Sequence, residues 1–214
     1  MNKKIKTVKS LEPWLEKKFK EYKVSVKISE SIYRFLHRLR GHVPNLYYHS
    51  LGVGYKSVSI GEFEEFKDNK PLLYGGLLHD TGKLRIEAAL FQDDRQITNK
   101  EYQIIKQHVD YSREMLRDEG LIITSLIAGM HHYFQENPYG LNPADMKVPS
   151  PGIRKEKLID YARIISLSDH HDALMHRKGK FNIDIKDKEA VKRHLLGNYP
   201  DSGRRIDFLL SLEI

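Results

Sequence analysis

The sequence predicts an all-α, single-domain protein that folds as a helical bundle. Apolar residues recur with helical spacing along nearly all of the 214 residues, and strand-like alternation of apolar and polar residues is scarce. No internal repeat, low-complexity segment or long Pro/Gly-rich linker divides the chain. Hydrophobic residues make up 40% and charged residues 30%, as in an ordinary globular protein. We therefore expect one core with modest extensions at its ends.

Three long helices have the clearest signals. The first follows a stripe that Gly41 is expected to end, made of Ile28, Ile32, Phe35, Leu36 and Leu39. The second begins at the capping box Thr98-Asn99-Lys100-Glu101 and is expected to continue as one helix through Tyr102, Ile105, Val109 and Leu116 until Gly120. The third spans about 155–175, and its buried stripe contains Leu158, Ala162, Ile165 and Asp169.

Shorter helices are expected at 11–22, 46–58, 70–79, 121–132, 187–195 and 205–212. We expect residues 1–45 to form N-terminal helices that pack on a core at 46–180. Residues 181–214 are expected to form a C-terminal helical extension of the same domain.

Composition restricts the chemistry. The chain has no cysteine, so disulfides, thiolate nucleophiles and zinc-thiolate sites are excluded, and any metal must use nitrogen and oxygen ligands. The apolar stretches are too short to cross a bilayer, and no apolar run follows the basic residues 1–9. We expect a cytoplasmic protein with no membrane partner. The net charge of +7 is explained either by a solvated basic surface or by attraction for a polyanion.

The strongest local motif is His79-Asp80-Thr81-Gly82-Lys83, at the end of an apolar helix. Adjacent helical residues point about 100° apart, so His79 and Asp80 both reach one metal cluster only if the helix end passes close beside it. The two oxygens of Asp80 can bridge two cations. Gly82 is expected to let the chain turn sharply, which brings Lys83 back as a fixed positive charge.

Further histidines and one aspartate recur at intervals long enough for a helix and a turn: His49, His108, His131, His132 and Asp169. Each alone has a structural explanation, as a hydrogen-bonded core histidine, a helix-ending cation or half of a salt bridge. Together they indicate a metal centre, because several helices of a bundle can each deliver ligands to one point. Cations also satisfy a buried cluster of this composition.

The order H, HD, H, HH, D resembles the HD superfamily of phosphohydrolases. The span from His79 to His108 resembles the HD-GYP branch without a gap, since the motif is followed by Ile86, Leu90, Thr98, Glu101 and Lys106-x-His108. The resemblance covers roughly 46–175 and implies an HD-type bundle. It also implies a metal held by His49, His79, Asp80 and Asp169, and a second held by His108, His131 and His132, with Asp80 bridging. Iron or manganese is expected, while zinc, nickel and magnesium also suit the ligands.

The chain departs from the HD-GYP pattern in two loops. After His131-His132 the branch usually has a glutamate and a Gly-Tyr-Pro loop, whereas this chain reads Tyr133-Phe134-Gln135-Glu136-Asn137-Pro138-Tyr139-Gly140. The loop that normally carries Lys-Pro-Gly reads Asp93-Asp94-Arg95. These departures leave the metal ligands intact, and they count against cyclic di-GMP as the specific substrate.

We therefore expect a metal-dependent phosphohydrolase that cleaves a phosphoester of a nucleotide or a related small phosphate with a metal-bridging hydroxide. Asp80 is expected to act as a bridge and Lys83 as the phosphate contact. Arg177 either approaches the non-reacting part of the substrate or is an exposed helix-end arginine. Asp172 either orients a ligand histidine or faces the surface. His170, His171 and His176 match nothing in the family and are expected to face solvent.

Three other functions stay open. A cyclic-dinucleotide phosphodiesterase is favoured by the ungapped HD-GYP register. A single-stranded nuclease is favoured by the basic charge, because CRISPR-associated HD nucleases have a similar ligand order, although no basic-aromatic motif supports nucleic acid. A non-catalytic nucleotide-binding module is opposed by the complete ligand set. The sequence does not predict the oligomeric state.

Overall fold

A computed structural model describes residues 11–92, 96–148, 153–176 and 183–212. Every regular element among these residues is helical, so the all-α prediction is confirmed. The α-helices are α1 (Leu11–Glu21), α2 (Val26–His42), α3 (Pro44–Phe63), α4 (Lys70–Leu78), α5 (Asn99–Lys106), α6 (His108–Asp118), α7 (Ile122–Met130), α8 (Lys155–His176), α9 (Lys188–Asn198) and α10 (Gly203–Ser211). Short 3₁₀ helices lie at η2 (Thr81–Arg85), η3 (Ala88–Phe91), η4 (Pro143–Asp145) and η5 (Pro200–Ser202).

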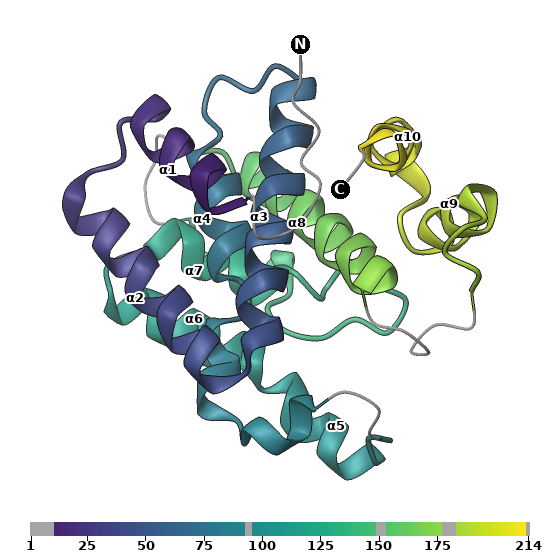
Figure 1. Cartoon of the computed structure of the whole chain (residues 1–214), viewed down its shortest axis with the longest axis horizontal. Coiled ribbons are helices and arrows are strands. Elements are labelled where there is room, and N and C mark those ends of the chain that lie inside the picture. The colour runs from purple at the N-terminus through teal and green to yellow at the C-terminus, as the bar shows by residue number, and fades with distance from the viewer. Residues whose placement is uncertain (1–10, 93–95, 149–152, 177–182, 213–214) are drawn as a thin grey trace.

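Helices α3 and α8 form the centre of the bundle. They pack on each other, and α4 packs on both of them (Figure 1). Helices α1 and α2 lie on one side, α6 and α7 complete the core, and α9 and α10 lie beyond α8. The predicted stripe of α8 is confirmed, because Leu158, Ala162 and Ile165 are at most 1% exposed. The division of the chain at residues 46 and 180 stays a prediction.

Two predicted helix boundaries are wrong. Helix α2 does not end at Gly41 but continues to His42, and Val43 then has an extended backbone with φ −146°. Val43 precedes Pro44, and the residue before a proline is pushed away from helical angles, so the proline rather than the glycine sets this boundary.

The predicted helix from Thr98 to Gly120 is two helices, α5 and α6, with Gln107 between them. The capping box at Thr98 and Glu101 is confirmed. The break has a packing reason. Helix α5 buries no residue, whereas α6 buries one face that starts at His108, so the chain changes direction where it enters the core.

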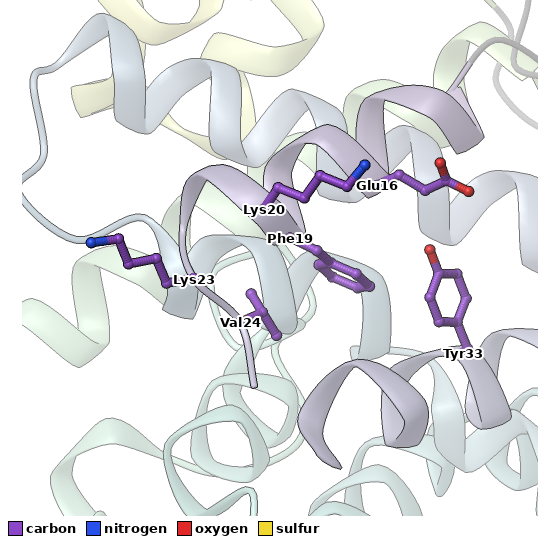
Figure 2. Close-up of a pocket in the computed structure, with 6 residues that line it drawn as sticks. All are labelled: Glu16, Phe19, Lys20, Lys23, Val24 and Tyr33. Carbon is purple, nitrogen blue, oxygen red and sulfur yellow. The ribbon is translucent and has the colours of Figure 1, made fainter. Parts of the chain in front are cut away.

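Helices α1 and α2 meet around an open hollow at the protein surface. The rings of Phe19 and Tyr33 pack edge to face with their centroids 5.4 Å apart. Figure 2 shows these two rings beside the other side chains that line the hollow, which are Glu16, Lys20, Lys23 and Val24. None of these residues belongs to the predicted metal centre. The hollow lies where α1 and α2 meet.

The structure also bears on the membrane question. Among the residues that it describes, no helix combines the length and the apolar character that a bilayer crossing requires.

Candidate metal centre

The seven predicted metal ligands converge inside the bundle. His49 comes from α3, and His79 and Asp80 lie between α4 and η2. His108 begins α6, His131 and His132 follow α7, and Asp169 lies on α8. All are buried except His132, whose side chain is 13% exposed. Ligands that are up to 120 residues apart in the sequence therefore meet only because five helices cross here.

Two carboxylates lie among the five imidazoles. Asp80 lies between two groups of histidines: its Oδ2 is 3.3 Å from His79 Nε2, and its Oδ1 is 3.2 Å from His108 Nε2. Asp169 Oδ1 is 3.0 Å from His49 Nε2. The ligands form three overlapping groups, and within each group the ligand atoms all lie within 4.8 Å of one another. The groups are His108 with His131 and His132, His49 with His79 and Asp169, and His79 with Asp80 and His131.

The histidine rings are oriented by hydrogen bonds on the side away from the cluster. Nδ1 of His79 donates to the Gly76 carbonyl oxygen at 2.9 Å, and Nδ1 of His108 and His131 donate to backbone carbonyl oxygens one turn earlier, at 2.7 and 2.6 Å. A proton on Nδ1 leaves a lone pair on Nε2, which faces the other ligands. Such backbone contacts are typical of histidines that bind a metal through Nε2.

Several atoms at the centre lack partners of their own. His49 Nε2, His79 Nε2 and Asp80 Oδ1 are buried and make no well-aligned hydrogen bond to any described residue. Leaving buried polar atoms unsatisfied is costly. Divalent cations would satisfy all three atoms, and a donor set of imidazole nitrogen and carboxylate oxygen suits first-row transition metals. The residues at this position therefore fit a metal.

The charge states of His131, His132 and Asp80 also fit a metal. His49 differs, because burial by itself would lower its pKa but the carboxylates of Asp169 and Asp172 raise it. Burial, together with the neighbouring His79 and His108, lowers the pKa of His131 to about 3, and burial beside His131 holds the pKa of His132 well below its usual value. Burial by itself would raise the pKa of Asp80, but Lys83 and His79 hold it well below its usual value. Neutral imidazoles and ionised carboxylates are the forms that bind cations.

Lys83 lies beside this cluster on η2. Its side chain is 7% exposed, and its Nζ is 2.5 Å from Asp80 Oδ2. Lys83 therefore lies near the ligands, as the sequence predicts. The turn at Gly82 is a 3₁₀ helix and does not use a positive φ.

Gly82 is instead required by a close approach between η2 and α6. A Cβ atom at this position would overlap the carbonyl oxygen of His108. The backbone N–H of Gly82 donates to Ser112 Oγ, which donates to the His79 carbonyl oxygen, both at 2.8 Å. The contact fixes the HD motif against the helix that carries His108.

We expect Gly82→Ala to destabilise the protein by about 1–3 kcal/mol, because the new methyl group overpacks a backbone contact. Thermal unfolding measures this effect. Gly41→Ala is the matched control, since a Cβ there meets nothing within 4 Å and alanine favours the helix. Equal unfolding temperatures for the two variants would contradict the packing role of Gly82.

The structure decides between the alternatives for the residues near Asp169. Asp172 is 2% exposed and its Oδ2 accepts a hydrogen bond from His49 Nδ1 at 2.7 Å, so the surface-facing alternative is wrong. His176 is exposed, as predicted, but His170 and His171 are only 8% and 5% exposed, so the prediction that they face solvent is wrong. Helix α9 covers this part of α8, with His194 Nε2 3.0 Å from His170 Nε2. Arg177 lies outside the described residues.

Sequence reasoning missed one contact of a predicted ligand and one contact of Asp172. The ring of Tyr139 stacks on His132 with centroids 4.5 Å apart, and Lys56 Nζ donates to Asp172 Oδ1 at 2.7 Å. Tyr139 had only its position in the loop after the HH pair as a signal. Lys56 had a better one, because it follows His49 by seven residues and so lies on the same face of a helix.

An all-α bundle that brings five histidines and two aspartates together in its interior could hold metal ions there. The HD domain family model matches residues 46–174, which is more than half of the chain. This chain therefore belongs to the HD-domain family, and its class is that of the metal-dependent phosphohydrolases. The match does not separate the HD-GYP branch from the rest, so that finer assignment stays a prediction.

Solved structures confirm the fold. The HD domain of the L. monocytogenes phosphodiesterase PgpH in complex with cyclic-di-AMP is similar with a TM-score of 0.56 and 15% identity, over 84% of this chain and 94% of that chain. Another structure of the same domain has a TM-score of 0.54 and 16% identity over the same shares. No curated protein sequence matches this chain significantly.

Proposed function

We propose that this protein hydrolyses a phosphoester of a nucleotide or related small phosphate with two divalent cations, iron or manganese. The convergence of the seven ligands, with Nε2 of the hydrogen-bonded rings turned inward, carries this proposal. One cation would be held by His49, His79, Asp80 and Asp169. The other would be held by His108, His131 and His132, with Asp80 shared between them.

The position of Asp80 supports its role as a bridge. One of its oxygens faces the rings of His49 and His79, at 3.6 and 3.3 Å from their Nε2 atoms, and the other faces His108. When bound, divalent cations neutralise negative charge on a phosphoryl group and lower the pKa of a coordinated water. Asp80 would hold both ions and is not the attacking group.

Lys83 supplies the remaining positive charge. Its ammonium is buried beside Asp80 and is the cation nearest to the ligands on η2. We assign it to an equatorial oxygen of the phosphoryl group, where a fixed ammonium stabilises charge that develops as the leaving group departs. A buried, low-dielectric position strengthens this interaction relative to the same contact in water.

The first test is the metal content per chain of carefully purified protein, with iron, manganese, zinc and nickel determined together. We expect about two iron or manganese ions per chain, followed by hydrolysis in a screen of phosphoesters that includes mononucleotides and single-stranded DNA. A chain that binds no metal even after reconstitution contradicts the enzyme and leaves the nucleotide-binding module. Cleavage of single-stranded DNA alone would instead identify a nuclease.

A cyclic-dinucleotide phosphodiesterase is the second candidate. The similar PgpH HD domain was solved with cyclic-di-AMP, and the residues from His79 to His108 keep the HD-GYP register. Cyclic di-AMP and cyclic di-GMP therefore belong in the same screen. A kcat/KM for either that exceeds those for mononucleotides favours this candidate, and no turnover of both rules it out.

A further inference from the structure

Helix α3 carries a buried lysine outside the predicted ligand set. Lys56 is 1% exposed, and its Nζ donates a hydrogen bond to Asp172 Oδ1 at 2.7 Å. A buried ammonium is costly unless it is paired, so Asp172 is the group that makes this position tolerable.

The second oxygen of Asp172 contacts a predicted metal ligand. Oδ2 accepts a hydrogen bond from His49 Nδ1 at 2.7 Å. On the Lys56 side, His176 Nδ1 also lies 3.4 Å from Oδ1, but the His176 ring is at the exposed end of α8. One buried carboxylate therefore connects Lys56 to His49, with a separate oxygen for each.

The spacing along α3 makes this arrangement fit. His49, Gly52 and Lys56 follow one another at i, i+3 and i+7, so they lie on one face of the helix, which packs on α8. A Cβ atom at Gly52 would overlap Asp172 Oδ1. Glycine at this position leaves the space in which the carboxylate reaches both neighbours.

We propose that Lys56 is a positioning residue: it holds the Asp172 carboxylate in place, so that the proton of His49 stays on Nδ1 and Nε2 is directed at the metals. The consequence for metal binding rests on the proposed function, because it takes His49 as a ligand. The consequence for the tautomer of His49 does not.

The charge environment supports this role. Lys56 and His49 each donate to one oxygen of Asp172, both at 2.7 Å, and all three side chains are buried. An ionised carboxylate accepts the Nδ1 proton of His49. Without the hydrogen bond from Lys56, the carboxylate is held less firmly against His49, and the His49 ring can then carry its proton on Nε2, where it blocks the metal-binding lone pair.

The test compares Lys56→Met with Lys18→Met in the full chain. Lys18 is also buried, at 7% exposed, and pairs with Glu21 on α1 and with Glu62, which lies near the end of α3 and belongs to no ligand set. We measure the dissociation constant for Mn²⁺ and the ¹⁵N resonances of His49 at alkaline pH, where the ring is neutral. Lys56→Met should weaken Mn²⁺ binding by about 10–100-fold and move part of the His49 proton to Nε2, whereas Lys18→Met should change neither.

Two more variants keep the test decisive where Lys56→Met folds poorly. Asp172→Asn keeps the side-chain volume and should shift the His49 proton and weaken Mn²⁺ binding in the same direction. Lys56→Arg keeps the positive charge and should restore both values towards those of the wild type.

The proposal is overturned if the Lys56 and Asp172 variants lower the unfolding temperature but keep the wild-type His49 tautomer and Mn²⁺ affinity. Lys56 would then be only a structural partner. Failure of the proposed function gives a different result. A wild-type chain that binds no Mn²⁺ contradicts the metal centre, and the His49 resonances of the Lys56 variants still test the role of Lys56.

Discussion

Replacing Asp80 with alanine should abolish phosphoester hydrolysis and metal retention together. Asp80 is the carboxylate whose two oxygens face different histidines, so its loss removes a ligand from both predicted metals at once. Loss of several kcal/mol of transition-state stabilisation lowers the rate by about 10³-fold or more. Metal analysis of the purified variant and the turnover rate of the best substrate measure the two effects.

The Asp80 variant requires a folding control, because the alanine leaves Lys83 buried without its carboxylate. Asp80→Asn keeps the volume and one acceptor oxygen, and thermal unfolding shows whether each variant keeps the native fold. Asp110→Ala is the matched surface control, since Asp110 is exposed on α6. This variant should retain full activity. A folded Asp80→Ala protein with wild-type activity would contradict the proposed mechanism.

Replacing Lys83 with alanine should slow turnover by about 10²-fold and spare both metals. Removal of one preorganised positive charge from a developing oxyanion has an effect of this size. Lys83 lies beside Asp80 but supplies no lone pair to a cation, so metal content should stay near the wild-type value. The decrease should fall on kcat more than on KM if the contact strengthens in the transition state.

Arg85→Ala is the control for the Lys83 variant. Arg85 is a cation on the same 3₁₀ helix, but it is exposed and pairs with Glu114 at 2.7 Å, away from the ligands. Its removal should leave kcat unchanged. If Lys83→Ala loses its metals, or if both variants slow turnover equally, the ammonium of Lys83 does not act on the phosphoryl group.

Features that depend on neighbouring residues were predicted from the sequence alone. The capping box at Thr98 forms as expected, because its two hydrogen bonds join residues three positions apart. The long helix at 155–176 is also local, since its stripe of Leu158, Ala162 and Ile165 repeats with the helical period.

The spacing of five histidines and two aspartates predicted a shared site because helices of a bundle bring such residues together, and the structure places all seven at one point.

Only the tertiary structure decided which side chains other helices cover. His170 and His171 have the polarity of surface residues, and they are buried because α9 and the α3 face around Lys56 pack against α8. Gln107 separates α5 from α6 because only the second of these helices enters the core. The pairing of Lys56 with Asp172 joins residues 116 positions apart. Periodicity in the sequence fixes the face of a helix on which a residue lies, whereas the partner of that face is set by long-range packing that no local pattern encodes.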